Sequence, residues 1–76
     1  MTVSEAVAER IVALCIERNI TINKLCTISG VTQSTINDIV NKRSKNPGIA
    51  TIKKLCDGLS ISLNDFFNDE IFCKTE

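Results

Sequence analysis

Polar side chains that can form hydrogen bonds are concentrated in one short stretch near the middle of the chain. In residues 32–41 the apolar residues Ile36, Ile39 and Val40 recur at helical spacing, which leaves the polar side chains on the other face of the helix. These polar residues are Gln33, Ser34, Thr35, Asn37, Asp38 and Asn41. Their amide, hydroxyl and carboxylate groups can bond the edges of base pairs in a DNA major groove. A solvated polar helix face is the simpler alternative.

A second helical pattern precedes this one. Leu25, Cys26 and Ile28 recur at helical spacing and predict a buried stripe on the first helix. Thr21 and Thr32 each precede one of the two patterns. A threonine hydroxyl accepts a hydrogen bond from the unpaired N–H groups of a first helical turn, so both residues are expected to cap a helix.

The residues between the two helices predict a tight corner. Gly30 adopts positive φ without a Cβ clash, so the first helix should end at Ser29 or Gly30. Val31 is expected to fill the angle between two helices packed across one another. Two capped helices joined by such a corner indicate a helix-turn-helix unit, whose second helix contacts DNA.

The charges of the chain are segregated along it, although they sum to zero. Residues 18–54 contain seven basic residues and one acid, Asp38, which gives +6, whereas residues 1–17 carry −2 and residues 55–76 carry −4. Phosphate binding needs only a local positive face, because salt screens each charge beyond about 8–10 Å. The segregation favours a nucleic-acid partner over chance clustering on a solvated surface.

Length and composition exclude several classes of protein. A chain of 76 residues, 43% apolar with three Phe and neither Trp nor Tyr, predicts one small helical domain without a large cavity. It has no histidine, no glycine-rich phosphate loop and no recognisable pair of catalytic carboxylates. We therefore expect no enzyme activity, cofactor, metal or small-molecule ligand. The chain lacks an apolar run of about 18 residues and a cleavable leader, so we expect a cytoplasmic protein without a membrane partner.

The four cysteines show no pattern of a disulfide framework or a metal site. Cys15, Cys26 and Cys56 fall on apolar helical positions beside leucines, and no CxxC pair is present. Buried, reduced thiols are therefore expected in preference to redox or metal sensing. Cys73 lies among polar residues and is the thiol expected to be exposed.

Three further helices are predicted around the pair. Ser4 is expected to cap a first helix that extends to Arg18. Its inward stripe consists of Val7, Ala8, Ile11, Leu14 and Cys15.

After the pair, Pro47 stops the preceding helix, and a fourth helix fits residues 49–59. Its expected inward residues are Ile49, Ile52, Leu55, Cys56 and Leu59. Ser62 is expected to cap a short fifth helix through Leu63, Phe66 and Phe67. In the tail, Ile71 and Phe72 either cover the core or meet a second subunit.

Three stretches in register, SGVTQSTINDIV, NKRSKNP and TIKKLCDGLSISLNDFF, resemble the lambda-repressor-like domains of phage Cro/CI repressors and of the XRE family of bacterial regulators. The resemblance extends from about Ala8 to Phe67. It implies an all-α, five-helix DNA-binding domain with the helix-turn-helix at helices two and three. Residues 1–68 would form this domain, and the tail, residues 69–76, would contribute to a dimer surface.

The resemblance also implies site residues. The base-contacting residues would be Thr32, Gln33, Ser34, Thr35, Asn37 and Asp38. The phosphate-contacting residues would be Asn23, Lys24, Asn41, Lys42, Arg43, Ser44, Lys45 and Asn46; a solvated turn is the alternative for the loop. Gln33 carries the sharpest expectation, because its amide can pair with adenine N6 and N7, which is worth about 1–3 kcal/mol of discrimination.

The chain departs from the family pattern at three places. Ile22 stands where the family often has Gln, so Asn23 and Lys24 would supply that backbone contact. Lys42 stands where a Gly often ends the recognition helix. Cys15 and Val40 stand where many members have a buried Arg–Glu pair, and we predict that these two side chains touch.

Together these features predict a sequence-specific transcriptional regulator, a small repressor that occupies double-stranded DNA as a homodimer. Leu63, Phe67, Ile71 and Phe72 are the candidate dimer residues, although Leu63 and Phe67 also fit the core. The alternative is a protein-interaction module of the same fold, an antitoxin or anti-regulator that binds through its apolar tail. Removal of residues 70–76 would distinguish the two.

Overall fold

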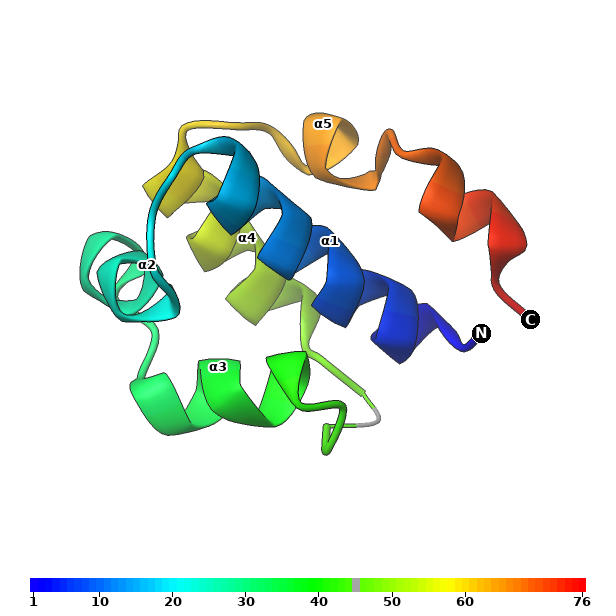
Figure 1. Cartoon of the computed structure of the whole chain (residues 1–76), viewed down its shortest axis with the longest axis horizontal. Coiled ribbons are helices and arrows are strands. Elements are labelled where there is room, and N and C mark those ends of the chain that lie inside the picture. The colour runs from blue at the N-terminus through cyan, green and yellow to red at the C-terminus, as the bar shows by residue number, and fades with distance from the viewer. Residues whose placement is uncertain (45) are drawn as a thin grey trace.

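Short apolar stripes flanked by capping residues fold this chain into helices joined by tight turns (Figure 1). The computed structural model describes residues 1–44 and 46–76. The helices are α1 (Val3–Glu17), α2 (Ile22–Ser29), α3 (Gln33–Val40), α4 (Ile49–Leu59), α5 (Leu63–Phe67) and the 3-10 helix η1 (Glu70–Lys74). The all-α class and the five expected helices are confirmed; η1 in the tail is an addition.

One apolar core joins all five α-helices. Its largest fully buried side chains are Phe66, Ile11, Leu25, Ile36, Leu55 and Cys56. The most extensive helix contacts are α2 against α4 and α1 against α3. The α2–α3 pair is therefore supported from behind by α1 and α4, which leaves the other side of α3 free for solvent.

Four hydroxyl residues cap helices. The caps expected at Thr21, Thr32 and Ser62 are confirmed, since each side chain accepts the N–H three residues later. The cap expected at Ser4 was wrong, because α1 begins one residue earlier and is capped by Thr2. Thr2 forms a reciprocal capping box with Glu5: the Thr2 hydroxyl accepts the Glu5 backbone N–H, and the Glu5 carboxylate accepts the Thr2 backbone N–H. This box satisfies two backbone N–H groups, whereas a cap by Ser4 alone would satisfy one.

Four helices end in a residue with left-handed backbone geometry. Gly30 has φ +72°, as expected for the corner. The other three, which are not glycines, are Asn19 (φ +56°), Lys42 (φ +62°) and Ser60 (φ +59°). After each of these, the next N–H bonds a carbonyl five residues back, which is the Schellman pattern that ends a helix.

Gly58 brings α4 into direct contact with the backbone of α2. A Cβ built on Gly58 would lie 2.9 Å from Ser29 Cα and 3.0 Å from the carbonyl carbon and oxygen of Ile28. Only a glycine permits this approach without moving a helix. Gly58 therefore positions the end of α2 and, through it, the corner that leads to α3.

Two apolar residues expected to face inward are exposed. Ile28 on α2 is 38% exposed, and Ile49 at the first position of α4 is 60% exposed. Both expectations were wrong because each residue sits at a helix end, where the inward stripe has already turned away from the core. Val31 is buried at 8% exposure, as expected for the residue that fills the corner.

The tail folds back onto α1, and Arg10 holds it there. The Arg10 guanidinium donates to the carbonyls of Phe66 (2.8 Å) and Asp65 (2.9 Å) and pairs with the Asp69 carboxylate (3.2 Å). Phe72 packs against the core, with its ring centroid 6.1 Å from that of Phe66. Phe72 therefore covers the core of its own chain.

The four thiols are free, and all but Cys26, which was expected to be buried, have the expected burial. Cys15 and Cys56 are buried, Cys26 is half-buried and Cys73 is exposed. Burial raises the pKa of the Cys15 and Cys56 thiols, which keeps both protonated at neutral pH. Among the residues that the structure describes, none of the helices is long and apolar enough to cross a membrane.

Candidate nucleic-acid interface

Helix α3 and the start of the loop after it lie along one edge of the molecule, and the C-terminal segment lies at the opposite side (Figure 1). Ile36 and Ile39 bury the inner side of α3. On its outer side Gln33, Ser34 and Asp38 are exposed and Asn37 is half-buried. The predicted base-contacting residues are thus brought together on one accessible helix face.

The first turn of α3 separates capping residues from free ones. The Thr32 hydroxyl accepts the Thr35 N–H, and the two threonine hydroxyls lie 2.8 Å apart in a mutual hydrogen bond. Gln33 and Ser34 side chains form no hydrogen bond with another described residue. The Thr32 and Thr35 side chains therefore bond each other and the helix cap, while the Gln33 and Ser34 side chains are left to bond solvent.

Asp38 is engaged at the other end of the same face. Its Oδ1 accepts from Arg43 Nε at 3.1 Å, and both side chains are more than half exposed. Two predicted DNA-contacting residues, one for a base and one for a phosphate, thus neutralise each other in the free protein. An exposed pair of this kind is worth about 0–1 kcal/mol, so it opens at small cost.

The predicted phosphate-contacting residues fall in two places. Asn23 and Lys24 are exposed in the first turn of α2. After α3, the exposed residues are Asn41, Lys42, Arg43 and Asn46, and Ser44 is half-buried. Lys45 lies outside the described residues. The structure therefore has two exposed polar groups of residues, one at the start of α2 and one after α3.

Ion pairs weaken the charge segregation that the sequence predicts. Lys42 pairs with Glu9, Arg43 with Asp38, and Lys53 with Asp57. Glu9 and Asp57 belong to the acidic ends of the chain, so folding brings some acids back beside the basic middle. Among the described residues of that middle segment, the cations outside an ion pair are Arg18, Lys24 and Lys54.

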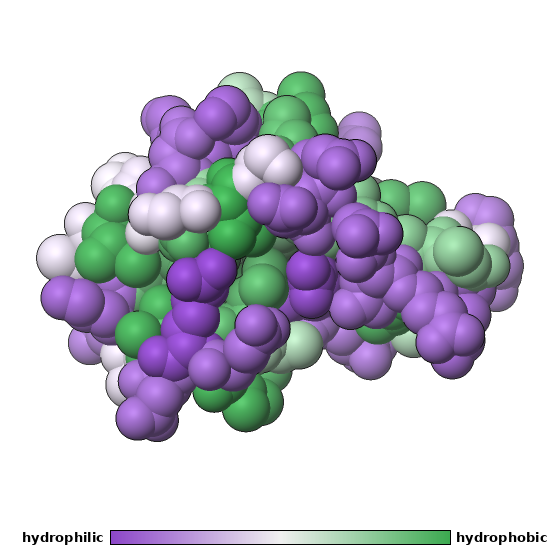
Figure 2. Space-filling model, turned by 90° about the horizontal axis from the view of Figure 1, so that it is seen from above, coloured by the Kyte–Doolittle hydropathy of each residue, from purple (hydrophilic) through white to green (hydrophobic). Residues whose placement is uncertain are grey.

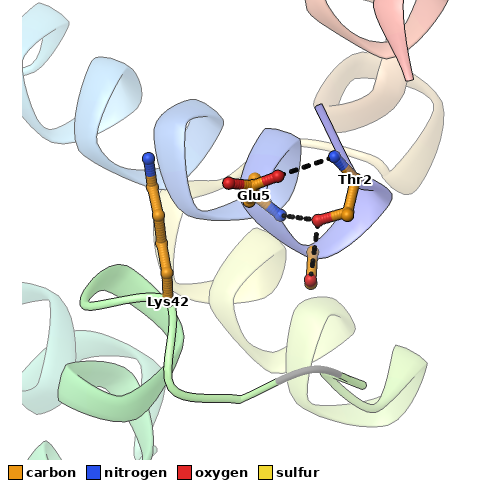
Figure 3. Close-up of a pocket in the computed structure, with 4 residues that line it drawn as sticks. Thr2, Glu5 and Lys42 are labelled. Atoms are coloured by element: carbon orange, nitrogen blue, oxygen red, sulfur yellow. Dashed lines mark hydrogen bonds between the residues drawn. The ribbon is translucent and has the colours of Figure 1, made fainter. Parts of the chain in front are cut away.

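The end of α3 is tied to α1 by charge. Lys42 Nζ lies 3.6 Å from Glu9 Oε2, and Lys42 also lines a shallow pocket with Thr2, Ser4 and Glu5 (Figure 3). The Thr2 backbone N–H and hydroxyl that bond Glu5 hold the pKa of that carboxyl below its usual value, and Lys42 adds to the effect. Sequence reasoning missed the pairing of Glu9 with Lys42, because it depends on how α1 packs against α3.

The remaining departures from the family pattern lie inside the fold. Ile22 is half-buried and packs against the core, so it cannot make a polar backbone contact. Cys15 is buried in the core, and Val40 is half-buried against the same cluster on the facing helix. Their direct contact remains a prediction. No three described His, Cys, Asp or Glu residues form a group that could hold a metal ion.

Comparison with known proteins agrees with this geometry. A model of the Cro/C1-type HTH DNA-binding domain matches residues 10–70. The HTH-type transcriptional repressor RghR of Bacillus subtilis (strain 168) is 44% identical over 57 residues, which cover 75% of this chain but only 42% of that repressor. The crystal structure of the prophage Lp1 protein 11 matches with a TM-score of 0.82 and 43% identity over 91% of each chain. With a capped helix pair, a glycine corner and an exposed polar α3, the chain belongs to the Cro/C1-type helix-turn-helix family of DNA-binding transcription regulators.

Proposed function

We propose that this chain is a cytoplasmic, sequence-specific repressor that works by occupying an operator, without catalysis, with α3 in the major groove. The observation that carries the proposal is the first turn of α3, where Thr32 caps the helix. The neighbouring Gln33 and Ser34 side chains are exposed and form no hydrogen bond with another described residue. Unpaired amide and hydroxyl groups at the start of such a helix are suited to direct reading of base edges.

The proposed base contacts differ in how much they cost to form. Gln33 and Ser34 need only lose water, whereas Asp38 must give up Arg43. The Thr32 and Thr35 hydroxyls remain bonded in the helix cap, so these residues contribute to base preference mainly through the shape of their side chains. Asn37 reaches the groove from a half-buried position. Gln33 is therefore the residue expected to contribute most to base preference.

The proposed phosphate contacts come from both sides of α3. Asn23 and Lys24 contact one stretch of backbone, and the loop residues Asn41, Lys42, Arg43, Ser44, Lys45 and Asn46 contact another. Contacts of this kind fix the position of a protein on the duplex but do not read sequence. They also make affinity fall with salt.

A single α3 reads few base pairs, so we propose a homodimer on an operator with two half-sites. We place the dimer surface on the side of α5 and the tail, away from α3, with residues 1–68 as the DNA-binding domain and 69–76 as part of the dimer contact. Leu63, Phe67 and Phe72 pack against their own core, which leaves the half-buried Ile71 as the better candidate. Seen from above, this side shows hydrophobic side chains between polar ones (Figure 2).

Selection from a pool of randomised duplexes tests the proposal. The chain is incubated with the pool at moderate salt, and the retained fraction is sequenced. An enriched inverted repeat would support a dimeric reader and define the operator. No retention, even at low salt where phosphate attraction is strongest, would overturn the proposal.

The alternative, a protein-interaction module, is favoured by apolar side chains that stay exposed on α1, notably Ile16 at 74% and Val12 at 39%. Removal of residues 70–76 no longer separates the two functions cleanly, because it also removes Phe72 from the core. Ile16→Ser is the cleaner test. It should leave duplex selection unchanged in a DNA reader and abolish regulation in a protein-binding module.

A further inference from the structure

Lys42 follows the C-cap of α3 and has a backbone conformation that is unfavourable for lysine. Its φ of +62° places it in the left-handed region, where a side chain with a Cβ is disfavoured and glycine is not. Its N–H donates to the Ile39 carbonyl at 3.0 Å, so the turn is a regular helix ending. Backbone geometry alone therefore does not explain a lysine at this position.

The side chain of Lys42 occupies a defined place beside α1. Its Nζ lies 3.6 Å from the Glu9 carboxylate, and both side chains are a little under half exposed. Figure 3 shows it extended alongside α1 and Glu5, which lines the same pocket. In the free protein this cation, which belongs to the proposed phosphate-contacting loop, is thus paired with the Glu9 carboxylate of another helix.

We infer that Glu9 competes with DNA for Lys42, and that Lys42 exchanges the Glu9 carboxylate for a phosphate when the duplex binds. The inference rests on the proposed function, which it deepens by assigning Glu9 as a residue that lowers affinity. The pair is exposed and therefore weak, so it can open whenever a stronger anion arrives. Phosphate is such an anion because the duplex concentrates negative charge along its backbone.

Arg43, the next residue, shows the same arrangement. Its guanidinium is held by Asp38 of α3 at 3.1 Å. Lys42 and Arg43, the two cations that follow the C-cap residue Asn41, are thus both neutralised within the chain. Exchange at two adjacent positions would lower the affinity of the chain for any duplex, because each of these phosphate contacts must first break an ion pair.

A double-mutant cycle on Glu9 and Lys42 tests the exchange. Four proteins are compared: the wild-type chain, Glu9→Gln, Lys42→Asn and the double variant. Asn is chosen because it tolerates the left-handed conformation while removing the charge. The probe is a random-sequence DNA duplex, since phosphate contacts do not depend on sequence, and the dissociation constant is measured at several salt concentrations.

The exchange predicts that Glu9→Gln tightens binding by roughly two- to five-fold in the wild-type background and has no effect when Lys42 is already Asn. Lys42→Asn should lower the steepness of the log-affinity against log-salt plot by about 0.9. Glu70→Gln is the matched control, because it removes the same charge from η1 at the far side and should change little.

Two results would overturn the inference. Equal tightening by Glu9→Gln in both backgrounds would show simple repulsion between Glu9 and DNA. Weaker binding by Glu9→Gln would show that Glu9 holds Lys42 in place on the phosphate. Failure of the wild-type chain to bind any duplex at low salt would instead overturn the proposed function, and the exchange with it.

Discussion

Different interactions hold the chain in place before and after α3. At its start, Gly30 makes the corner, and Gly58 lets α4 touch the backbone just before it. At its end, the same left-handed geometry falls on Lys42, and the neighbouring contacts are ion pairs to Glu9 and Asp38. The start is therefore fixed by close packing, whereas the turn that follows the end is held by exposed charges.

This difference indicates what each end does. Close packing against backbone is rigid, because an added methyl group has no space, and it fixes the angle at which α3 leaves the corner. Exposed ion pairs are weak and salt-sensitive, so the end of α3 can rearrange its contacts. The start is suited to presenting Gln33 at a fixed angle, and the end to adjusting to a phosphate backbone.

The largest effect is expected at the joint between α1 and the end of α3. Cys15→Arg would bury an unpaired charge in the core, and we expect a loss of about 3–5 kcal/mol in the free energy of unfolding. Adding Val40→Glu should recover part of that loss if the two side chains touch. Urea denaturation of both single variants and the double variant measures the coupling, and additive effects would show that Cys15 and Val40 are not in contact.

A smaller loss is expected at the packed start. Gly58→Ala adds a methyl group 2.9 Å from Ser29 Cα. We expect a loss of about 2 kcal/mol in unfolding free energy, because overpacking outweighs the roughly 1 kcal/mol gain in helix propensity.

The matched control is Gly48→Ala, whose added Cβ would meet only Thr51 Oγ1, at 3.9 Å. That change should cost about 0.5 kcal/mol or less. Denaturation curves that show equal stability for the two alanine variants would contradict a rigid contact between α4 and α2.

The two left-handed residues at the ends of α3 should respond in opposite directions. Gly30→Ala has open space around the new methyl group, so its cost is conformational only, about 1 kcal/mol. Lys42→Gly relieves the same strain and should gain about 0.5 kcal/mol, less any loss of the Glu9 pair. It should also weaken duplex binding. The reference is Lys42→Ala, which also lacks the pair with Glu9 but keeps a Cβ at positive φ. A Lys42→Gly variant that is less stable than Lys42→Ala would refute the assignment of strain to this position.

The smallest perturbation is thiol labelling, which leaves the sequence unchanged. Under native conditions Cys73 should react with a thiol reagent first and Cys26 more slowly. Cys15 and Cys56 should react only after the chain unfolds, because both are buried and their pKa values are raised. Mass spectrometry of each labelled cysteine over time measures this order. Rapid labelling of Cys15 would mean that the α1–α3 joint opens readily.

The same raised pKa values give a pH dependence. In the unfolded chain the thiols of Cys15 and Cys56 ionise at their ordinary pKa, whereas in the folded chain they ionise only at higher pH. Both thiols therefore contribute fully to stability at any pH below the ordinary thiol pKa. This contribution is lost as the pH rises toward the folded values. Denaturation midpoints should therefore fall in the alkaline range, and less so in a Cys56→Ala variant than in wild type. An equal alkaline fall in the two proteins would rule out a contribution from the Cys56 thiol.

The fold could be predicted where local rules act alone. Thr21, Thr32, Ser62 and Gly30 were identified correctly because a cap or a corner depends on neighbours within a few residues. The extent of α4, residues 49–59, also followed from its apolar spacing and Pro47.

Features that depend on tertiary packing were missed. The role of Arg10 rests on carbonyls at the end of α5, more than fifty residues away, and no local pattern indicates it. Gly58 looks like an unfavourable residue inside a helix until α2 is placed against it. In the candidate interface, residue types indicated which side chains face outward, but the pairing of Lys42 with Glu9 required the fold.

The central claim is that α3 reads bases through its first turn, and a second selection with Gln33→Ala tests it most directly. The account predicts that the wild-type chain and the variant enrich the same inverted repeat, with the preference relaxed at one position in each half-site. Base preferences that are unchanged at every position, or an overall loss of affinity without loss of preference, would contradict it.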